Sequence, residues 1–328
     1  MANNQEQFNA FHDIINATKA RCSTLKNNRD ALRNRIRKYF KEYHPDDIQP
    51  VFHCQGSYAM HTILAPIKDE NGLGAYDLDD GIYFIGQSES ECKSLEWYHS
   101  EILKAVENHT STGAKDNDPC VTVYYADGHH IDLPIYFMVK GTDRPKLAHR
   151  KEPWVGSDPR ELISWFSDEC KKKPMLRRLV RYMKAWCENI RNEKGFKMPT
   201  GCIMTILTAK YYQGNDNSRE DIAMRDILTA MYDELSIENC FHCWRPTFPY
   251  EDLFEHYKKT RKEKFLAELK SFKDDVSRAI ENKNPHEACL KWQKHFGDRF
   301  CCSTAKDEDE DAQAKSYSGF INTNSRFA

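Results

Sequence analysis

The chain has 328 residues, which is enough for one large domain or two domains of ordinary size. Charged residues make up 30% of it and hydrophobic residues 40%, a balance typical of a globular protein with a hydrophobic core. The formal net charge is −2, so the chain lacks the basic surplus of proteins that grip long nucleic acid. We therefore expect no long nucleic acid as a partner.

The first residues are polar and contain no apolar core of a signal peptide, and no apolar run approaches the length of a membrane span. We therefore expect a cytoplasmic protein with no membrane partner. Twelve cysteines are scattered along the chain. In this setting we expect reduced and mostly buried thiols rather than a disulfide framework.

Apolar residues recur at helical spacing from about residue 5 to residue 41, which predicts one long N-terminal helix ending at His44-Pro45. A β-rich section follows, in which Asp127-Gly128 is a hairpin-turn signal and the Leu95–Val106 segment is a helix. Helices beside an apolar sheet predict an α+β fold. The predicted strands are 51–54, 76–85, 121–125 and 130–138.

The helical period dominates from about residue 158 onward, with an apolar stripe from Leu176 to Ile190. Thr200 precedes a further helix, and Asn284-Pro285 is a clear helix N-terminus. Beyond residue 302 an acidic block is followed by polar sequence, which predicts a flexible tail. We therefore predict a first domain at 1–150, a helical domain at 151–302 and a tail at 303–328.

Three carboxylates are the strongest chemical signal. Asp77 and Asp79 are two residues apart in a predicted strand, so they project from the same face. In the later strand, Asp132 takes the face opposite to its apolar neighbours. If the two strands are neighbours, the three carboxylates converge. Because close carboxylates repel one another without a cation, we expect them to bind Mg²⁺, as two ions, with Mn²⁺ as an alternative.

Gly56-Ser57 lies ahead of these carboxylates, immediately after a short apolar run. Glycine allows the backbone to approach a phosphate closely, and the N–H groups and the Ser57 hydroxyl are suited to the β- and γ-phosphates of a nucleotide. Tyr58 is a candidate for stacking on a purine, although an aromatic residue near a strand is more often part of the core.

At these residues the sequence resembles the polymerase-β-type nucleotidyltransferases. The closer resemblance is to the bacterial cyclic-oligonucleotide synthases (CD-NTases), relatives of animal cyclic GMP-AMP synthase. It rests on QGSYAMHT at 55–62, YDLDDGIYF at 76–84 and HHIDLPIYF at 129–137, with weaker support in the helical half. It implies a two-lobed fold: a core with a mixed sheet and a long N-terminal spine helix, a helical domain, and an active site in the cleft between.

The resemblance also implies roles for individual residues. Asp77, Asp79 and Asp132 match the catalytic, metal-binding triad. Gln55 opens the matching Gly-Ser stretch and is grouped with the nucleotide-binding residues. Lys184 matches a lysine that contacts the donor triphosphate. Thr200 stands where relatives often have a serine near the same phosphates, although a plain helix cap is an alternative role.

The function implied is magnesium-dependent synthesis of a cyclic di- or trinucleotide, of the cyclic GMP-AMP kind, from ATP and/or GTP in antiphage signalling. Two alternatives stay open. One is a template-independent nucleotidyltransferase acting on RNA or a small acceptor, and the other is a non-catalytic nucleotide sensor. The tail is also a candidate for conjugation by a partner encoded in the same operon.

Overall fold

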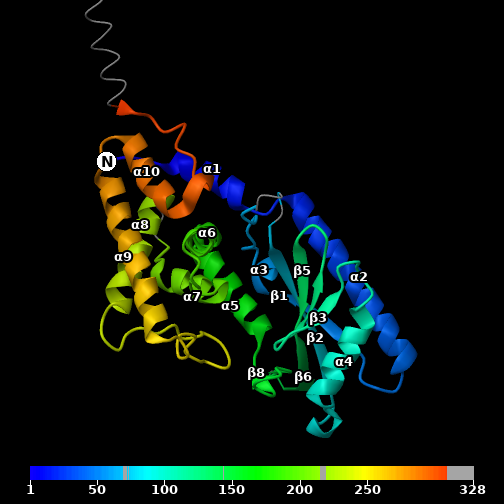
Figure 1. Ribbon diagram of the computed structural model, residues 1–328. Helices are drawn as coiled ribbons and strands as arrows, with labels where there is room; N and C mark the ends of the chain where they lie inside the picture. The colour runs from blue at the N-terminus through cyan, green and yellow to red at the C-terminus, as the bar shows by residue number, and fades with distance from the viewer. Residues whose placement is uncertain (69–71, 73, 143, 215–218, 309–328) are drawn as a thin grey trace, which may run out of the picture. The chain divides into compact units, whose positions relative to one another are not determined.

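The computed structural model describes residues 1–68, 72, 74–142, 144–214 and 219–308 (Figure 1). The chain forms two compact units, each discontinuous in sequence. Among the described residues, the sheet unit comprises those within 16–177 and 243–253, and the helical unit comprises those within 1–15, 178–242 and 254–308. These units divide the chain differently from the predicted domains, whose boundaries near residues 150 and 302 stay a prediction.

The sheet unit is built on a mixed sheet, which confirms the predicted α+β class. Across the described residues, eight strands are joined in the order β3-β4-β5-β2-β6-β7-β8, with β1 paired to β2. The central strand β2 is antiparallel to β1 and parallel to both β5 and β6. The strands are β1 Val51–Gln55, β2 Tyr76–Gly86, β3 Ala114–Asp116, β4 Val121–Tyr124, β5 His129–Leu133, β6 Ile135–Val139, β7 Lys146–Leu147 and β8 Val155–Gly156.

One face of this sheet carries the core of the unit. Helices α2 and α4 lie on this face in Figure 1, and their apolar residues form one buried cluster with alternate residues of β2 and β5, among them Leu78 and Ile131. The residues between these, starting with Asp77 and Asp132, belong to the opposite face because strand side chains alternate. The helices of the unit are α2 Lys19–Tyr43, α3 Gly56–Ala59, α4 Leu95–Val106, the short η1 Glu89–Glu91 and α5 Pro159–Lys172.

Pro134 divides the segment that we predicted as one strand over 130–138, so that prediction is wrong in this detail. Proline has no N–H to donate to a sheet ladder, and the segment becomes β5 and β6. Both strands nevertheless pair with β2, and the Pro134 carbonyl accepts a hydrogen bond from the Ile82 N–H at 2.8 Å. The interruption therefore leaves the alternation of faces intact along the whole segment.

The helical unit packs around aromatic side chains. Phe8 of α1 contacts Trp292 of α10 with ring centroids 4.8 Å apart, and Trp186 of α6 contacts Phe272 of α9 at 5.2 Å. These rings are fully buried. Such pairs supply large apolar areas with defined edge geometry. The helices are α1 Gln5–Ile15, α6 Leu176–Lys194, α7 Gly201–Tyr211, α8 Glu220–Leu235, α9 Lys259–Glu281, α10 Pro285–Phe296 and the short η2 Gly297–Arg299.

The predicted continuous helix from 5 to 41 is wrong, because the chain forms α1 and α2 with a break at 16–18. Thr18 is extended and its side chain accepts from the Arg21 N–H, so it caps a new helix. The apolar stripes of the two helices are nearly in phase, which hid the break from the periodicity. The two helices belong to different compact units.

The expectation of reduced cysteines is wrong for one pair. Cys289 and Cys302 form a disulfide, while the other ten cysteines are not disulfide-bonded. Both bonded residues are buried, as predicted for the thiols, but α10 places them close enough to bond. Most of the predicted flexible tail, 309–328, lies outside the described residues. Among those described, no helix combines the length and apolar character that a membrane span requires.

A buried ion pair joins α2 to the central strand. Arg33 donates to both carboxylate oxygens of Asp80 at 2.7 and 2.5 Å, and the Asp80 side chain is 0% exposed. Burial raises the pKa of the Asp80 carboxyl, and the Arg33 guanidinium opposes that rise. Asp80 faces the core side of β2, so the pair holds α2 against the strand that carries Asp77 and Asp79.

We predict that Arg33→Met destabilises the protein by about 3–5 kcal/mol, because it leaves the Asp80 carboxylate buried without a partner. Urea unfolding followed by circular dichroism measures the change. Arg37→Met is the matched control, since Arg37 is exposed on the same helix, and it should cost less than about 1 kcal/mol. Adding Asp80→Leu to Arg33→Met should restore much of the loss. Equal effects of the two arginine variants would contradict this account.

Candidate metal and nucleotide site

The carboxylates predicted as a triad lie on two adjacent parallel strands. In the register of β2 and β5, Asp77 lies opposite His130 and Asp79 lies opposite Asp132. Residues two apart in a strand point to the same face, and so do residues that lie directly opposite each other in neighbouring strands. All four side chains therefore belong to one face of the sheet. The opposite face holds the buried residues Leu78, Ile131 and Leu133. The strands are therefore neighbours, which is the condition that the sequence argument required.

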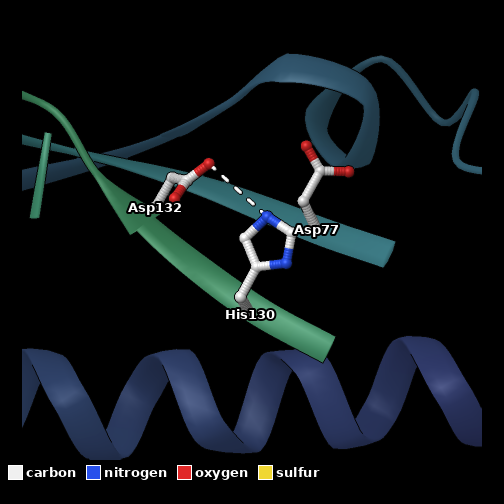
Figure 2. A group of neighbouring side chains, drawn as sticks. All are labelled: Asp77, His130 and Asp132. Atoms are coloured by element: carbon white, nitrogen blue, oxygen red, sulfur yellow. Dashed lines mark ion pairs between the residues drawn. The ribbon is translucent and has the colours of Figure 1, made fainter. Parts of the chain in front are cut away.

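Three of these residues form a group that could hold a metal ion. One ligand atom from each of Asp77, His130 and Asp132 lies within 4.8 Å of the others. Figure 2 shows the His130 ring between the two carboxylates, all three side chains rising from the same side of the strands. The Nε2 atom of His130 lies 3.8 Å from Oδ2 of Asp132. Two hard carboxylate donors fit a hard divalent cation such as Mg²⁺ or Mn²⁺.

Asp79 lies against the turn that follows β1. Gly56 has φ of +64°, a conformation that favours glycine. A Cβ at position 56 would overlap the Asp79 carboxylate. Because Gly56 has no side chain, the Asp79 carboxylate can lie directly against the backbone at the start of α3. Ser57 is the second residue of this short helix and is half-buried.

The orientation of Asp132 is set by a hydrogen-bonded chain from the neighbouring strand. Thr122 of β4 lies opposite Asp132, and its hydroxyl donates to Oδ1 at 2.6 Å. The same hydroxyl accepts from the Asn117 side-chain amide at 2.9 Å, so its proton is directed to Asp132. With Oδ1 engaged in this way, Oδ2 is the oxygen that faces His130.

Gln55 and Tyr58 have structural contacts in this unit. The buried Gln55 amide donates to the Tyr136 hydroxyl at 3.1 Å. The Tyr58 hydroxyl donates to the Cys22 carbonyl at 3.4 Å, and its ring packs against the core cluster. Burial raises the pKa of the Tyr58 hydroxyl. Their roles in nucleotide binding stay predictions.

Lys184 and Thr200 lie together within the helical unit. Thr200 caps α7, its hydroxyl accepting from the Ile203 N–H at 3.4 Å. A Cβ at Gly201 would lie 3.0 Å from Cε of Lys184, so the lysine stem passes directly over the start of α7. The structure thus shows the capping role of Thr200. The contacts of both residues with phosphates stay predictions.

His130 and Thr122 were missed by the sequence argument. The signal for His130 was present, because it is two residues before Asp132 and so shares its face. The position of Thr122 opposite Asp132 follows from the Asp127-Gly128 turn, which sets the register of β4 against β5.

Nearby, burial and then the Asp132 charge raise the pKa of Cys120 to about 12, so this thiol stays protonated.

Comparison with known proteins identifies this region. Residues 50–136 match the family described as cyclic GMP-AMP synthase DncV-like, nucleotidyltransferase domain. A cyclic GMP-AMP synthase of Escherichia albertii is 28% identical over 194 residues, covering 57% of this chain and 42% of that protein. One from Escherichia coli is 24% identical over 223 residues, covering 51% and 50%. The chain thus spans half or less of the length of these curated relatives.

The fold is that of Vibrio cholerae DncV. The apo form of that protein superimposes with a TM-score of 0.75 at 19% identity, covering 91% of this chain and 96% of that one. Its complex with the linear intermediate pppA(3′,5′)pG gives 0.72 at 21% identity, covering 88% and 93%. The match over residues 50–136 includes the strands that bear Asp77 and Asp132, and together with these relatives it supports a DncV-like CD-NTase of the polymerase-β-type nucleotidyltransferase superfamily.

Proposed function

We propose that this protein makes a cyclic dinucleotide, of the cyclic GMP-AMP kind, from ATP and GTP in a reaction that requires a divalent metal ion. The observation that carries the proposal is the parallel register that sets Asp79 beside Asp132 and Asp77 beside His130 on one face. The family match over the same strands supports it. The vibrio enzyme has been captured with a linear pppA(3′,5′)pG intermediate, which supports two successive transfers in one site.

Each transfer joins a ribose hydroxyl of one nucleotide to the α-phosphorus of another. A P–O bond forms, the bond to the β-phosphate oxygen breaks, and pyrophosphate leaves. When bound, the divalent ions neutralise charge on the attacking and leaving oxygens. Asp77, Asp79 and Asp132 would hold them, and Asp132 would accept or help to polarise the proton of the attacking hydroxyl. The Gly56-Ser57 turn would hold the β- and γ-phosphates beside Asp79.

We assign Lys184 to the donor triphosphate and give Thr200 a second role beside its cap, since the two lie together at the start of α7. A cationic side chain over a helix N-terminus suits phosphate oxygens. Antiphage signalling, a cytoplasmic location and conjugation of the C-terminus remain predictions from the resemblance. The residues that would be conjugated lie outside the described part of the chain.

The activity is tested by incubating the purified chain with ATP, GTP and Mg²⁺ or Mn²⁺, treating with phosphatase, and analysing by mass spectrometry. We predict a phosphatase-resistant cyclic product. Asp77→Asn with Asp79→Asn should lower it at least about a hundredfold through loss of metal ligands. Asp13→Asn with Asp46→Asn is the matched control, because both residues are exposed, and should leave the yield unchanged.

Three results would oppose the proposal. Extension of added RNA without a cyclic product would favour a polymerase. No chemistry with either ion would favour a sensor. Full activity in the Asp77 and Asp79 double variant would show that these carboxylates are not the metal ligands, but it would not contradict the match to the nucleotidyltransferase family.

The two hydrogen bonds that link Asn117 to Thr122 and Thr122 to Asp132 lead to a further prediction. Thr122→Val keeps the shape of a residue that is 3% exposed but removes the donor to Asp132. We expect turnover to fall about 10–100-fold, the usual cost of losing a hydrogen bond that orients a metal ligand. Thr122→Ser, which keeps the hydroxyl, should retain most of the activity. Steady-state rates across a metal titration provide the measurement, and equal rates for Thr122→Val and Thr122→Ser would contradict the role.

A further inference from the structure

His130 is the one residue that is not acidic in the group of four paired side chains on this face. The other three are Asp77, Asp79 and Asp132. His130 lies opposite Asp77 across the β2–β5 pair and two residues before Asp132 on its own strand. The Asp79 carboxylate lies against Gly56. Among the described residues, one ligand atom from each of Asp77, His130 and Asp132 lies within 4.8 Å of the other two, which gives a mixed set of nitrogen and oxygen donors (Figure 2).

The spacing of this group suits an ion better than a direct contact. The Nε2 atom of His130 and Oδ2 of Asp132 are 3.8 Å apart, which is too long for a hydrogen bond. Around an octahedral ion with bonds of about 2.1 Å, neighbouring ligand atoms lie about 3 Å apart and opposite ones about 4 Å apart. The observed separation lies between these two values.

Neighbouring contacts hold both side chains in place. The Tyr124 ring on β4 lies 6.0 Å from the His130 ring, on the side away from Asp77. The His130 and Asp132 side chains are 27% and 24% exposed, so the group remains open to solvent and to a nucleotide. Thr122 engages only Oδ1 of Asp132, which leaves Oδ2 directed to the histidine.

An imidazole ligand changes which ion a carboxylate site prefers. Mg²⁺ favours oxygen ligands and keeps much of its water. Imidazole nitrogen binds transition-metal ions, and carboxylates accept Mn²⁺ as readily as Mg²⁺. Two carboxylates with one imidazole therefore favour Mn²⁺ more strongly than three carboxylates do.

We infer that His130 is a ligand of the divalent ion held by Asp77 and Asp132, and that it makes this site select Mn²⁺ over Mg²⁺. The inference deepens the proposed function and rests on it for the role of the ion. It adds a nitrogen ligand to the acidic triad, and it makes His130 a determinant of metal specificity.

The binding test uses the full chain with ¹⁵N-labelled histidine, Mn²⁺ and a non-hydrolysable ATP analogue. Pulsed electron paramagnetic resonance detects ¹⁵N coupled to bound Mn²⁺, and the label separates histidine nitrogen from adenine nitrogen. We expect a directly coupled ¹⁵N in the wild type and none in His130→Gln. The exposed His256 provides the control variant His256→Gln, which should keep the signal.

The specificity test measures Mn²⁺ binding in competition with Mg²⁺. We expect His130→Gln to lower the ratio of Mn²⁺ to Mg²⁺ affinity about tenfold or more. His130→Asp, which supplies a third oxygen ligand, should retain metal binding and shift preference towards Mg²⁺. Circular dichroism checks that each variant is folded.

The outcomes separate this inference from the proposed function. Bound Mn²⁺ without histidine ¹⁵N coupling, or an unchanged affinity ratio in His130→Gln, overturns the inference even if cyclic product forms. Histidine coupling in a chain that makes no cyclic product with any ion supports the ligand assignment and sinks the synthase proposal instead.

Discussion

The candidate site depends on the register of one parallel strand pair. Because side chains alternate along a strand, a slip of one residue between β2 and β5 would send the acidic residues of one of these strands into the core and its apolar residues to the other face. The apolar cluster under α2 and α4 opposes that slip, since Leu78, Ile131 and Leu133 are fully buried within it. Hydrophobic packing on one face thus determines carboxylate convergence on the other.

Polar contacts then fix the positions of the strands and side chains that this register brings together. The Arg33–Asp80 pair anchors α2 to the strand bearing Asp77 and Asp79. Across the sheet, Thr122 orients one oxygen of Asp132 and leaves the other for His130. A buried ion pair adds little net stability, but removing one partner is costly. Such contacts are therefore better understood as fixing positions than as supplying stability.

The mixed donor set distinguishes the site from a purely acidic one. The family match over residues 50–136 accounts for the carboxylates, but it does not predict which ion is preferred, because that preference depends on every donor within reach. His130 is within reach of both Asp77 and Asp132. The strand alternation that places the carboxylates on one face also places the His130 imidazole there, and we propose that this imidazole sets the metal preference.

The sequence alone determined the α+β class and the strands that carry Asp77, Asp79 and Asp132, because alternation and helical period are local properties. The family was suggested by the resemblance of three motif stretches, at 55–62, 76–84 and 129–137. It did not show the break at Thr18, the division at Pro134 or the Cys289–Cys302 bond. Those depend on how segments far apart in sequence pack and pair. The sequence placed His130 on the same strand face as Asp132, but only the pairing of β2, β5 and β4 brings His130 and Thr122 together with the carboxylates.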